Sequence, residues 1–84
     1  MLILNQAGDE MFTLENIISI KVMKQKENGV EAWFVEAVVP ENDNYIELGK
    51  YADEESANMA FHNIYTCYVD GYKCMKLDSC KDGN

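Results

Sequence analysis

Hydrophobic and polar residues alternate in the first half of the chain, as is typical of β-strands with one buried face. In residues 17–24, Ile18, Ile20 and Val22 recur at every second position, which predicts that they share the core face of a strand. Shorter apolar segments lie at residues 2–4, 11–14 and 45–51. Polar or glycine-containing turns separate these segments, so the pattern predicts an antiparallel meander of about four strands.

The clearest turn signal is Lys-Glu-Asn-Gly at residues 26–29. Asn28 and Gly29 tolerate positive φ angles, which both central residues of a type I′ hairpin turn require. The strand that follows, residues 30–39, is apolar on both faces, which is typical of a strand that is central in its sheet or covered on its second face. Pro40 ends this strand, because proline has no N–H to donate to a sheet.

From residue 53 onward the hydrophobic period changes to that of a helix. Asp53 is the predicted N-cap, and Gly71 suits the left-handed conformation just past the C-terminal end. The apolar positions form one stripe, made of Ala57, Ala60, Phe61, Ile64, Cys67 and Tyr68. Such a stripe needs a surface to cover, so we predict an α+β fold in which the meander packs against one C-terminal helix.

Residues 72–77 are compatible with a short final strand that pairs with an edge of the sheet. The last residues are polar, and we expect residues 79–84 to form a flexible tail. A chain of 84 residues is too short for two ordinary domains, so residues 1–78 are predicted to form a single α+β domain.

The charge balance narrows the classes of partner. Seven lysines, no arginine and fifteen acidic residues give a net charge of −8. Nucleic acids and anionic membranes are bound through basic surfaces, so we expect neither as a direct partner. An acidic surface suits a basic protein instead. No segment is apolar enough to span a bilayer and no secretory signal is visible, so we expect a cytoplasmic location.

Metal-binding and catalytic chemistry find little support in the sequence. His62, Cys67, Cys74 and Cys80 lack the closely spaced pairs of a structural zinc site. The five-residue step from His62 to Cys67 places the two side chains on different helix faces, so they do not form a nucleophile and its base. We expect free thiols, no cofactor, no metal ion and no enzymatic activity.

A partner-binding surface is the remaining kind of site. Glu41, Asp43 and Glu47 cluster around a polar loop, where they can steer the chain toward a basic surface. Trp33 and Tyr45 are the aromatic residues that we expect in an exposed apolar patch. A sheet face that the helix leaves uncovered must be buried against something else, and a homo-oligomer is the simplest solution.

Three short motifs carry a resemblance: Met-Leu-Ile-Leu-Asn-Gln at residues 1–6, Leu-Glu-Asn-Ile at residues 14–17, and Leu-Gly-Lys-Tyr at residues 48–51 ahead of Asp-Glu-Glu and the helix. With them the chain resembles small, largely uncharacterised proteins from Firmicutes and their prophages. The resemblance implies a bacterial or phage setting and a compact α+β domain, and it transfers no catalytic residue. The segment from Tyr72 onward lies outside it.

Two functions from different classes follow as expectations. The first is a non-enzymatic, phage-encoded interaction protein that binds a basic host protein, as an inhibitor of the anti-defence or anti-CRISPR type would. The alternative is an oligomeric small-molecule binding module, for example for a nucleotide signal, with its pocket between protomers. Lacking arginine, such a module would hold phosphate through lysines and backbone amides.

Overall fold

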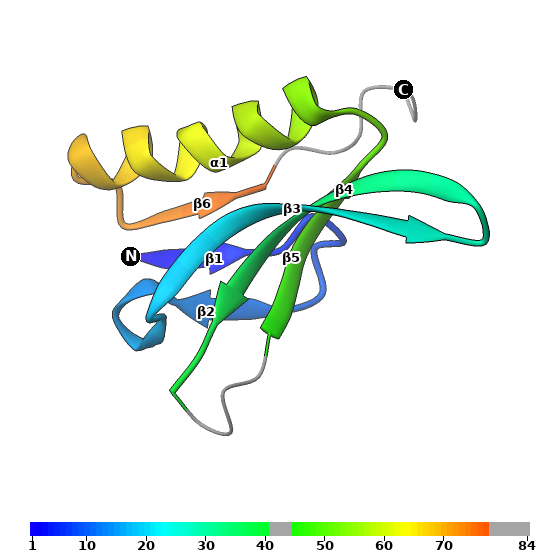
Figure 1. Ribbon diagram of the computed structural model, residues 1–84. Coiled ribbons are helices and arrows are strands. Elements are labelled where there is room, and N and C mark those ends of the chain that lie inside the picture. Colours follow the sequence, from blue (N-terminus) through cyan, green and yellow to red (C-terminus); the bar gives the residue numbers. More distant parts are fainter. Residues whose placement is uncertain (41–44, 78–84) are drawn as a thin grey trace.

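The computed structural model of the chain describes residues 1–40 and 45–77. The predicted loop acids Glu41 and Asp43, Cys80 and the predicted tail over residues 79–84 lie outside the described residues. Along the described chain the elements are β1 (Leu2–Leu4), β2 (Met11–Thr13), a short 3₁₀ helix η1 (Leu14–Asn16), β3 (Ser19–Glu27), β4 (Val30–Val38), β5 (Tyr45–Tyr51), α1 (Glu54–Val69) and β6 (Cys74–Lys76) (Figure 1).

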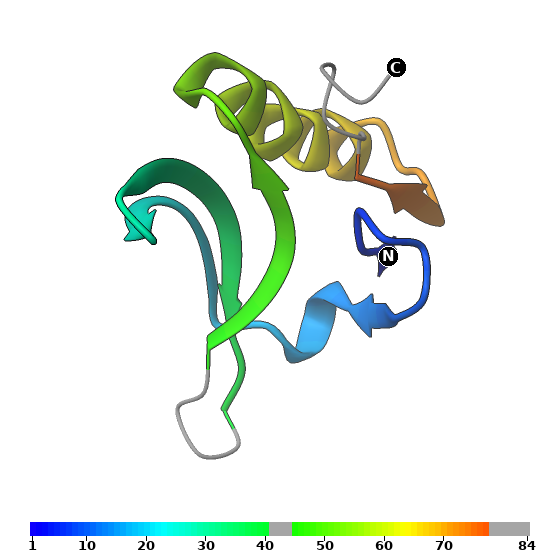
Figure 2. The same ribbon diagram turned by 90° about the vertical axis from the view of Figure 1, so that its right-hand side faces the viewer.

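The predicted α+β fold class is confirmed, and the strands divide between two sheets. β3, β4 and β5 form an antiparallel meander, while a second sheet has the order β2-β1-β6. β1 runs antiparallel to β2 and parallel to β6, so the predicted final strand exists and pairs with the first one. Figure 2 shows the curved meander on one side, the small sheet on the other, and α1 above both.

The turn after β1 explains why the first strands do not continue the meander. The Asn5 side-chain oxygen accepts hydrogen bonds from the backbone N–H groups of Gly8, Asp9 and Glu10, at 2.9, 3.1 and 3.3 Å. This side-chain cap adds to the backbone bonds of the turn, which run from the Asn5 N–H to the Glu10 carbonyl and from the Gly8 N–H to the Asn5 carbonyl, and the chain reverses tightly. η1 then carries the chain from the small sheet to the meander, so β2 and β3 belong to different sheets.

The predicted hairpin and helix ends are confirmed. Asn28 and Gly29 have φ angles of 53° and 79°, both positive as a type I′ turn requires. The Asp53 carboxylate accepts the Ser56 N–H at 2.7 Å and so caps the start of α1. At the other end Gly71 has a φ of 79°, and the Tyr72 N–H donates to the Cys67 carbonyl at 3.0 Å, as in a Schellman motif.

β4 is the central strand of the meander and is buried on both faces, as its sequence predicts. One face carries Val35 and Ala37 into the main core, beneath the helix residues Ala57, Ala60 and Ile64. On the other face Phe34 is only 2 % exposed. The side chains above that face include Lys50, whose Nζ lies 5.8 Å from the Phe34 ring centre, and a pair of polar residues, Gln25 and Glu36, joined by a 3.2 Å hydrogen bond.

Two residues that the patterns assign to the core lie at the surface. Ile18 is 62 % exposed, so its predicted core position is wrong. The Ile18 N–H donates to the Val38 carbonyl, although Val38 is in register with Ser19. Ile18 and Ser19 therefore both oppose Val38, as in a β-bulge, and the alternation of side chains between the two faces is interrupted here. Tyr68, the last member of the helix stripe, is 58 % exposed, because it lies in the final turn of α1.

Candidate functional site

An apolar groove lies between the C-terminal half of α1 and the start of β3. Its volume is about 270 Å³, and no charged side chain lines it. α1 contributes four residues and the segment from η1 into β3 contributes five. The lining residues are Leu14, Ile17, Ile18, Ser19, Ile20, Phe61, Ile64, Tyr65 and Tyr68.

The groove has a buried floor and an exposed aromatic rim. Ile64 is 5 % exposed and belongs to the core, whereas Tyr65, Tyr68 and Ile18 are 67 %, 58 % and 62 % exposed. Apolar side chains that gather at the surface around a hollow are typical of binding sites rather than of ordinary surface. Tyrosine is moreover one of the residues that contribute most to protein interfaces, because its large ring is rigid and its hydroxyl stays hydrated.

One wall of the groove is the start of an unpaired strand edge. Within the described residues β3 is bonded only to β4, although it is nine residues long. Glu27 and Val30 flank a two-residue turn, so they exchange hydrogen bonds, and bonded and non-bonded pairs alternate from there along the ladder. The N–H and C=O groups of Ile20, Val22, Lys24 and Lys26 therefore point away from β4.

At the opposite edge of the meander, Gln6 bonds to the backbone of β5. The Gln6 side chain accepts the Lys50 N–H at 2.8 Å and donates to the Lys50 carbonyl at 2.9 Å. The Gln6 N–H also donates to the Leu48 carbonyl at 2.8 Å. Leu48 is the extra residue where the β4–β5 register shifts, so a bulge interrupts this edge as well. β5 is thus closed where β3 is open.

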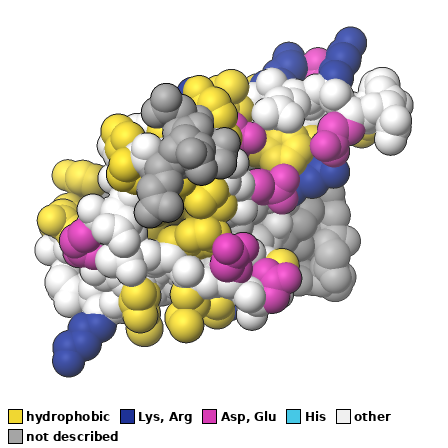
Figure 3. Space-filling model, turned by 90° about the horizontal axis from the view of Figure 1, so that it is seen from below, with side chains coloured by type: hydrophobic (Ala, Val, Ile, Leu, Met, Phe, Trp, Pro, Cys, Tyr) yellow, Lys and Arg dark blue, Asp and Glu magenta, His cyan; other side chains and the backbone are white. Residues whose placement is uncertain are grey.

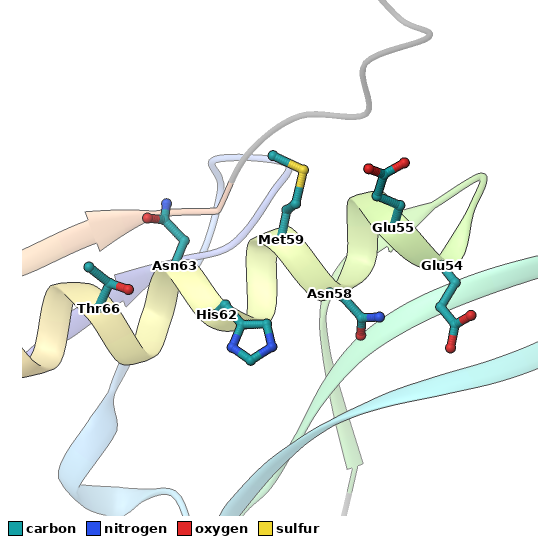
Figure 4. A pocket seen from close by; sticks show the side chains of 7 residues that line it. All are labelled: Glu54, Glu55, Asn58, Met59, His62, Asn63 and Thr66. Atoms are coloured by element: carbon teal, nitrogen blue, oxygen red, sulfur yellow. The ribbon is translucent and has the colours of Figure 1, made fainter.

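A second, larger hollow follows the outer side of α1, with a volume of about 620 Å³. All seven residues that line it come from this one helix, and Figure 4 shows Glu55 and Met59 on one side of the helix and Glu54 and Asn58 on the other. A single convex helix cannot enclose a ligand, so this hollow is a less suitable site than the groove. His62 is exposed here, and no group of metal-ligating side chains occurs within residues 1–40 and 45–77.

The predicted partner-binding residues do not line the groove where they are described. Tyr45 and Glu47 share the outer face of β5, and Tyr45 is 59 % exposed with the Lys21 Nζ 4.6 Å from its ring centre. Trp33 lies on the opposite, core-facing side, half-buried against the core. The structure therefore brings Tyr45 and Glu47 together but separates them from Trp33.

The groove residues have one signal in the sequence. From residue 56 to residue 69 the helix contains no Asp, Glu, Lys or Arg, although a helix with one solvated face normally carries charges along it. Tyr65 and Tyr68 belong to this uncharged stretch. Its length indicates a helix with apolar or aromatic residues on more than the core-facing side.

Among the described residues, every charged side chain lies at least partly at the surface. A 2.7 Å ion pair with Glu27 raises the pKa of Lys50, chiefly through its hydrogen bond. The hydrogen bond from the Met1 amino group to Glu15 lowers the pKa of that carboxyl group. Figure 3 shows acidic side chains interspersed with hydrophobic ones on one face of the molecule. Cys67 and Cys74 are free thiols.

Comparison of the chain with protein-family models, with curated proteins and with solved structures finds no match. In the part of the chain that the structure describes, no helix is long and apolar enough to cross a membrane.

Proposed function

We propose that this chain is a non-enzymatic interaction protein that binds a basic partner protein through the groove between α1 and β3. The observation that carries the proposal is an uncharged groove with exposed tyrosines on a chain of net charge −8. The acidic surface accelerates encounter with a basic partner, and the aromatic rim supplies the contact energy. Glu47, with Glu41 and Asp43, belongs to the acids that steer the encounter.

The shape and lining of the groove favour a protein over a small molecule. Its volume of about 270 Å³ lies below the roughly 300–1,000 Å³ that is usual for ligand pockets. No lysine lines it, and the hollow on α1 carries Glu54 and Glu55, which would repel phosphate. A nucleotide-binding module therefore has less support than a protein-binding one.

The biological setting rests on the resemblance to Firmicutes and prophage proteins. With that setting, we propose that the protein acts in the cytoplasm of a bacterial host, as a phage-encoded inhibitor of the anti-defence or anti-CRISPR type. Host proteins that handle nucleic acids carry the basic surfaces that such an acidic inhibitor would cover. Direct binding of nucleic acid by this chain itself is disfavoured by its net charge of −8.

Site-specific photocrosslinking tests the proposal. A benzophenone amino acid at position 65 should capture a basic protein in bacterial lysate, and the same group at position 72, an exposed tyrosine that does not line the groove, should not. The captured protein is then purified, and its association rate with this chain should fall about tenfold or more between low and physiological salt. Equal capture at both positions, or an association rate that does not depend on salt, would contradict the proposal.

Solution mass separates a foreign partner from self-association. Light scattering in reductant should give the monomer mass, since each copy carries a charge of −8. A stable oligomer whose formation requires Tyr65 would instead identify a second copy as the partner.

A further inference from the structure

We propose that the groove and the open edge of β3 form one site, in which an extended segment of the partner adds to the meander as a fourth strand. The inference rests on the proposed function and specifies how the partner is held. The segment would place apolar side chains at alternate positions in the groove and would carry basic residues at its ends.

The groove and the strand edge are contiguous. The groove is lined by Ile18, which precedes β3 at the bulge, and by Ser19 and Ile20, the first and second residues of β3. Since β3 is an edge strand of the meander, the groove adjoins the start of this edge. A chain that pairs with this edge would therefore pass directly beside Tyr65 and Tyr68.

The open edge supplies the main-chain part of recognition. The outward N–H and C=O groups of Ile20, Val22 and Lys24 present the pattern that an antiparallel or parallel strand can pair with. The bonds of Lys50 independently support this direction for the backbone groups of β3. The Lys50 N–H and C=O turn away from β4 toward Gln6. Lys50 is in register with Phe34 without bonding to it, so the N–H and C=O of Phe34 bond to Met23 on the other side. Because the bonding direction alternates along a strand, the backbone groups of the residues on either side of Met23, Val22 and Lys24, point away from β4.

Length distinguishes this edge from the other open edges of the described fold. β2 and β6 also end a sheet, but each has three residues, whereas β3 has nine. Strand addition derives its affinity from a row of main-chain hydrogen bonds, and its specificity from pockets for alternate side chains. Among the described strands, β3 offers a long edge with an apolar groove beside it.

The net negative charge of the chain favours basic residues at the two ends of the partner segment. The chain as a whole has a net charge of −8, and two of the three lysines of β3 already have contacts: Lys24 pairs with Glu31 at 3.1 Å, and Lys21 lies over the Tyr45 ring. Basic residues that flank an apolar extended segment would complement the net charge. A second copy of this chain brings the same acidic charge and is disfavoured as the occupant.

The experiment uses a defined probe, the blocked nonapeptide Lys-Lys-Val-Thr-Ile-Thr-Val-Lys-Lys, with ¹⁵N-labelled protein. Bound peptide should slow hydrogen exchange of the Ile20, Val22 and Lys24 amides about tenfold or more, and leave the Lys50 amide unchanged. Tyr65→Ala should weaken binding about tenfold. Tyr72→Ala is the matched control, a similarly exposed tyrosine that does not line the groove, and should bind as the unchanged protein does.

Two altered peptides test the binding mode. Methylation of the alternate peptide nitrogens that face β3 should abolish binding, while methylation of the intervening nitrogens should preserve it, because only one set bonds to the strand edge. Replacing the four lysines by glutamate should weaken binding, and the loss should diminish as salt rises. Binding that is indifferent to methylation or to Tyr65→Ala would overturn the inference, as would no binding at about 1 mM peptide.

The outcome is separable from that of the proposed function. If the crosslinked partner binds but leaves the β3 amides unprotected, the strand-addition site is wrong while the interaction function stands. If the peptide binds in the expected mode but no basic partner is captured, the site stands and the proposed function is wrong. If the protein alone dimerises with slowed β3 amides, a second copy occupies the edge and the inference is overturned.

Discussion

The two edges of the meander differ in how their backbone groups are satisfied. At the β5 edge, Gln6 bonds to both backbone groups of Lys50 and to the Leu48 carbonyl. At the β3 edge, the nine-residue strand has no second strand partner besides β4 among the described residues, and an apolar groove adjoins its start. An exposed strand edge is a hazard for aggregation, and proteins usually close or charge it. Here one edge is closed, and the other carries Lys21, Lys24 and Lys26.

The two edges differ in whether another chain can pair with them. A closed edge cannot accept another chain without first breaking its own bonds. An edge that is merely charged repels uncontrolled pairing but stays open to a segment with the right side chains. The comparison therefore indicates where this protein can receive a partner, and it can be tested on each edge separately.

The largest expected effect concerns how firmly each edge strand is anchored in the core. Leu48 of β5 is 1 % exposed, whereas Ile18 at the start of β3 is 62 % exposed. Leu48→Ala should lower the free energy of unfolding by about 2–5 kcal/mol, because it leaves a cavity. Ile18→Ala should change it by no more than about 0.5 kcal/mol. Urea denaturation measures both, and similar losses would mean that Ile18 is buried after all.

Proline substitutions on β3 give the next largest effect. The Gln25 N–H faces β4, so Gln25→Pro should cost about 1–3 kcal/mol through a lost ladder bond, with Gln25→Ala as the control for its side chain. The Lys26 N–H faces outward, so Lys26→Pro should cost less than about 1 kcal/mol. Equal losses in urea denaturation would show that the Lys26 N–H is also bonded and that the edge is not open.

A smaller effect is expected from opening the closed edge. Gln6→Glu keeps an acceptor for the Lys50 N–H but removes the donor to the Lys50 carbonyl, so it should cost about 1 kcal/mol, the net value of one hydrogen bond. Hydrogen exchange at the Lys50 amide should stay slow in Gln6→Glu and become faster in Gln6→Ala. An unchanged exchange rate in Gln6→Ala would show that Gln6 does not close this edge.

The smallest effect concerns the ion pair that joins the two edge strands. Glu27 holds the pKa of Lys50 above its ordinary 10.5, so the pair stabilises the fold below that pH and the contribution is lost as the pH rises through the raised pKa. Glu27→Gln should bring the Lys50 pKa back toward 10.5, measured by NMR titration of its side chain. The melting temperature at neutral pH should not change measurably, because exposed ion pairs contribute little.

Local signals in the sequence predict most of the elements. The turn at Asn28 and Gly29, the cap at Asp53 and the helix end at Gly71 each depend on a few neighbouring residues, and all three are confirmed. The division into two sheets could not be predicted in this way. It depends on β1 pairing with β6, whose residues lie at opposite ends of the described chain.

Apart from the uncharged stretch of α1, the groove could not be predicted from the sequence, for a related reason. Period-two and helical patterns assign Ile18 and Tyr68 to the core, because each continues a run of apolar positions. Their burial depends on how α1 packs across the start of β3, a contact between distant parts of the sequence that no local pattern specifies. The roles predicted for Trp33, Tyr45, Glu47, Glu41 and Asp43 in partner binding stay predictions.

The parallel pairing of β1 with β6 also has a consequence in time. During synthesis β1 is made before β6, so Leu2 must wait for Cys74 before the pairing can form. The meander needs only contacts between successive strands, so we expect it to form first, and the small sheet to follow once most of the chain is available. Ile3, which is completely buried in the finished fold and lies in register with Met75, then reaches its full burial only after β6 has joined β1.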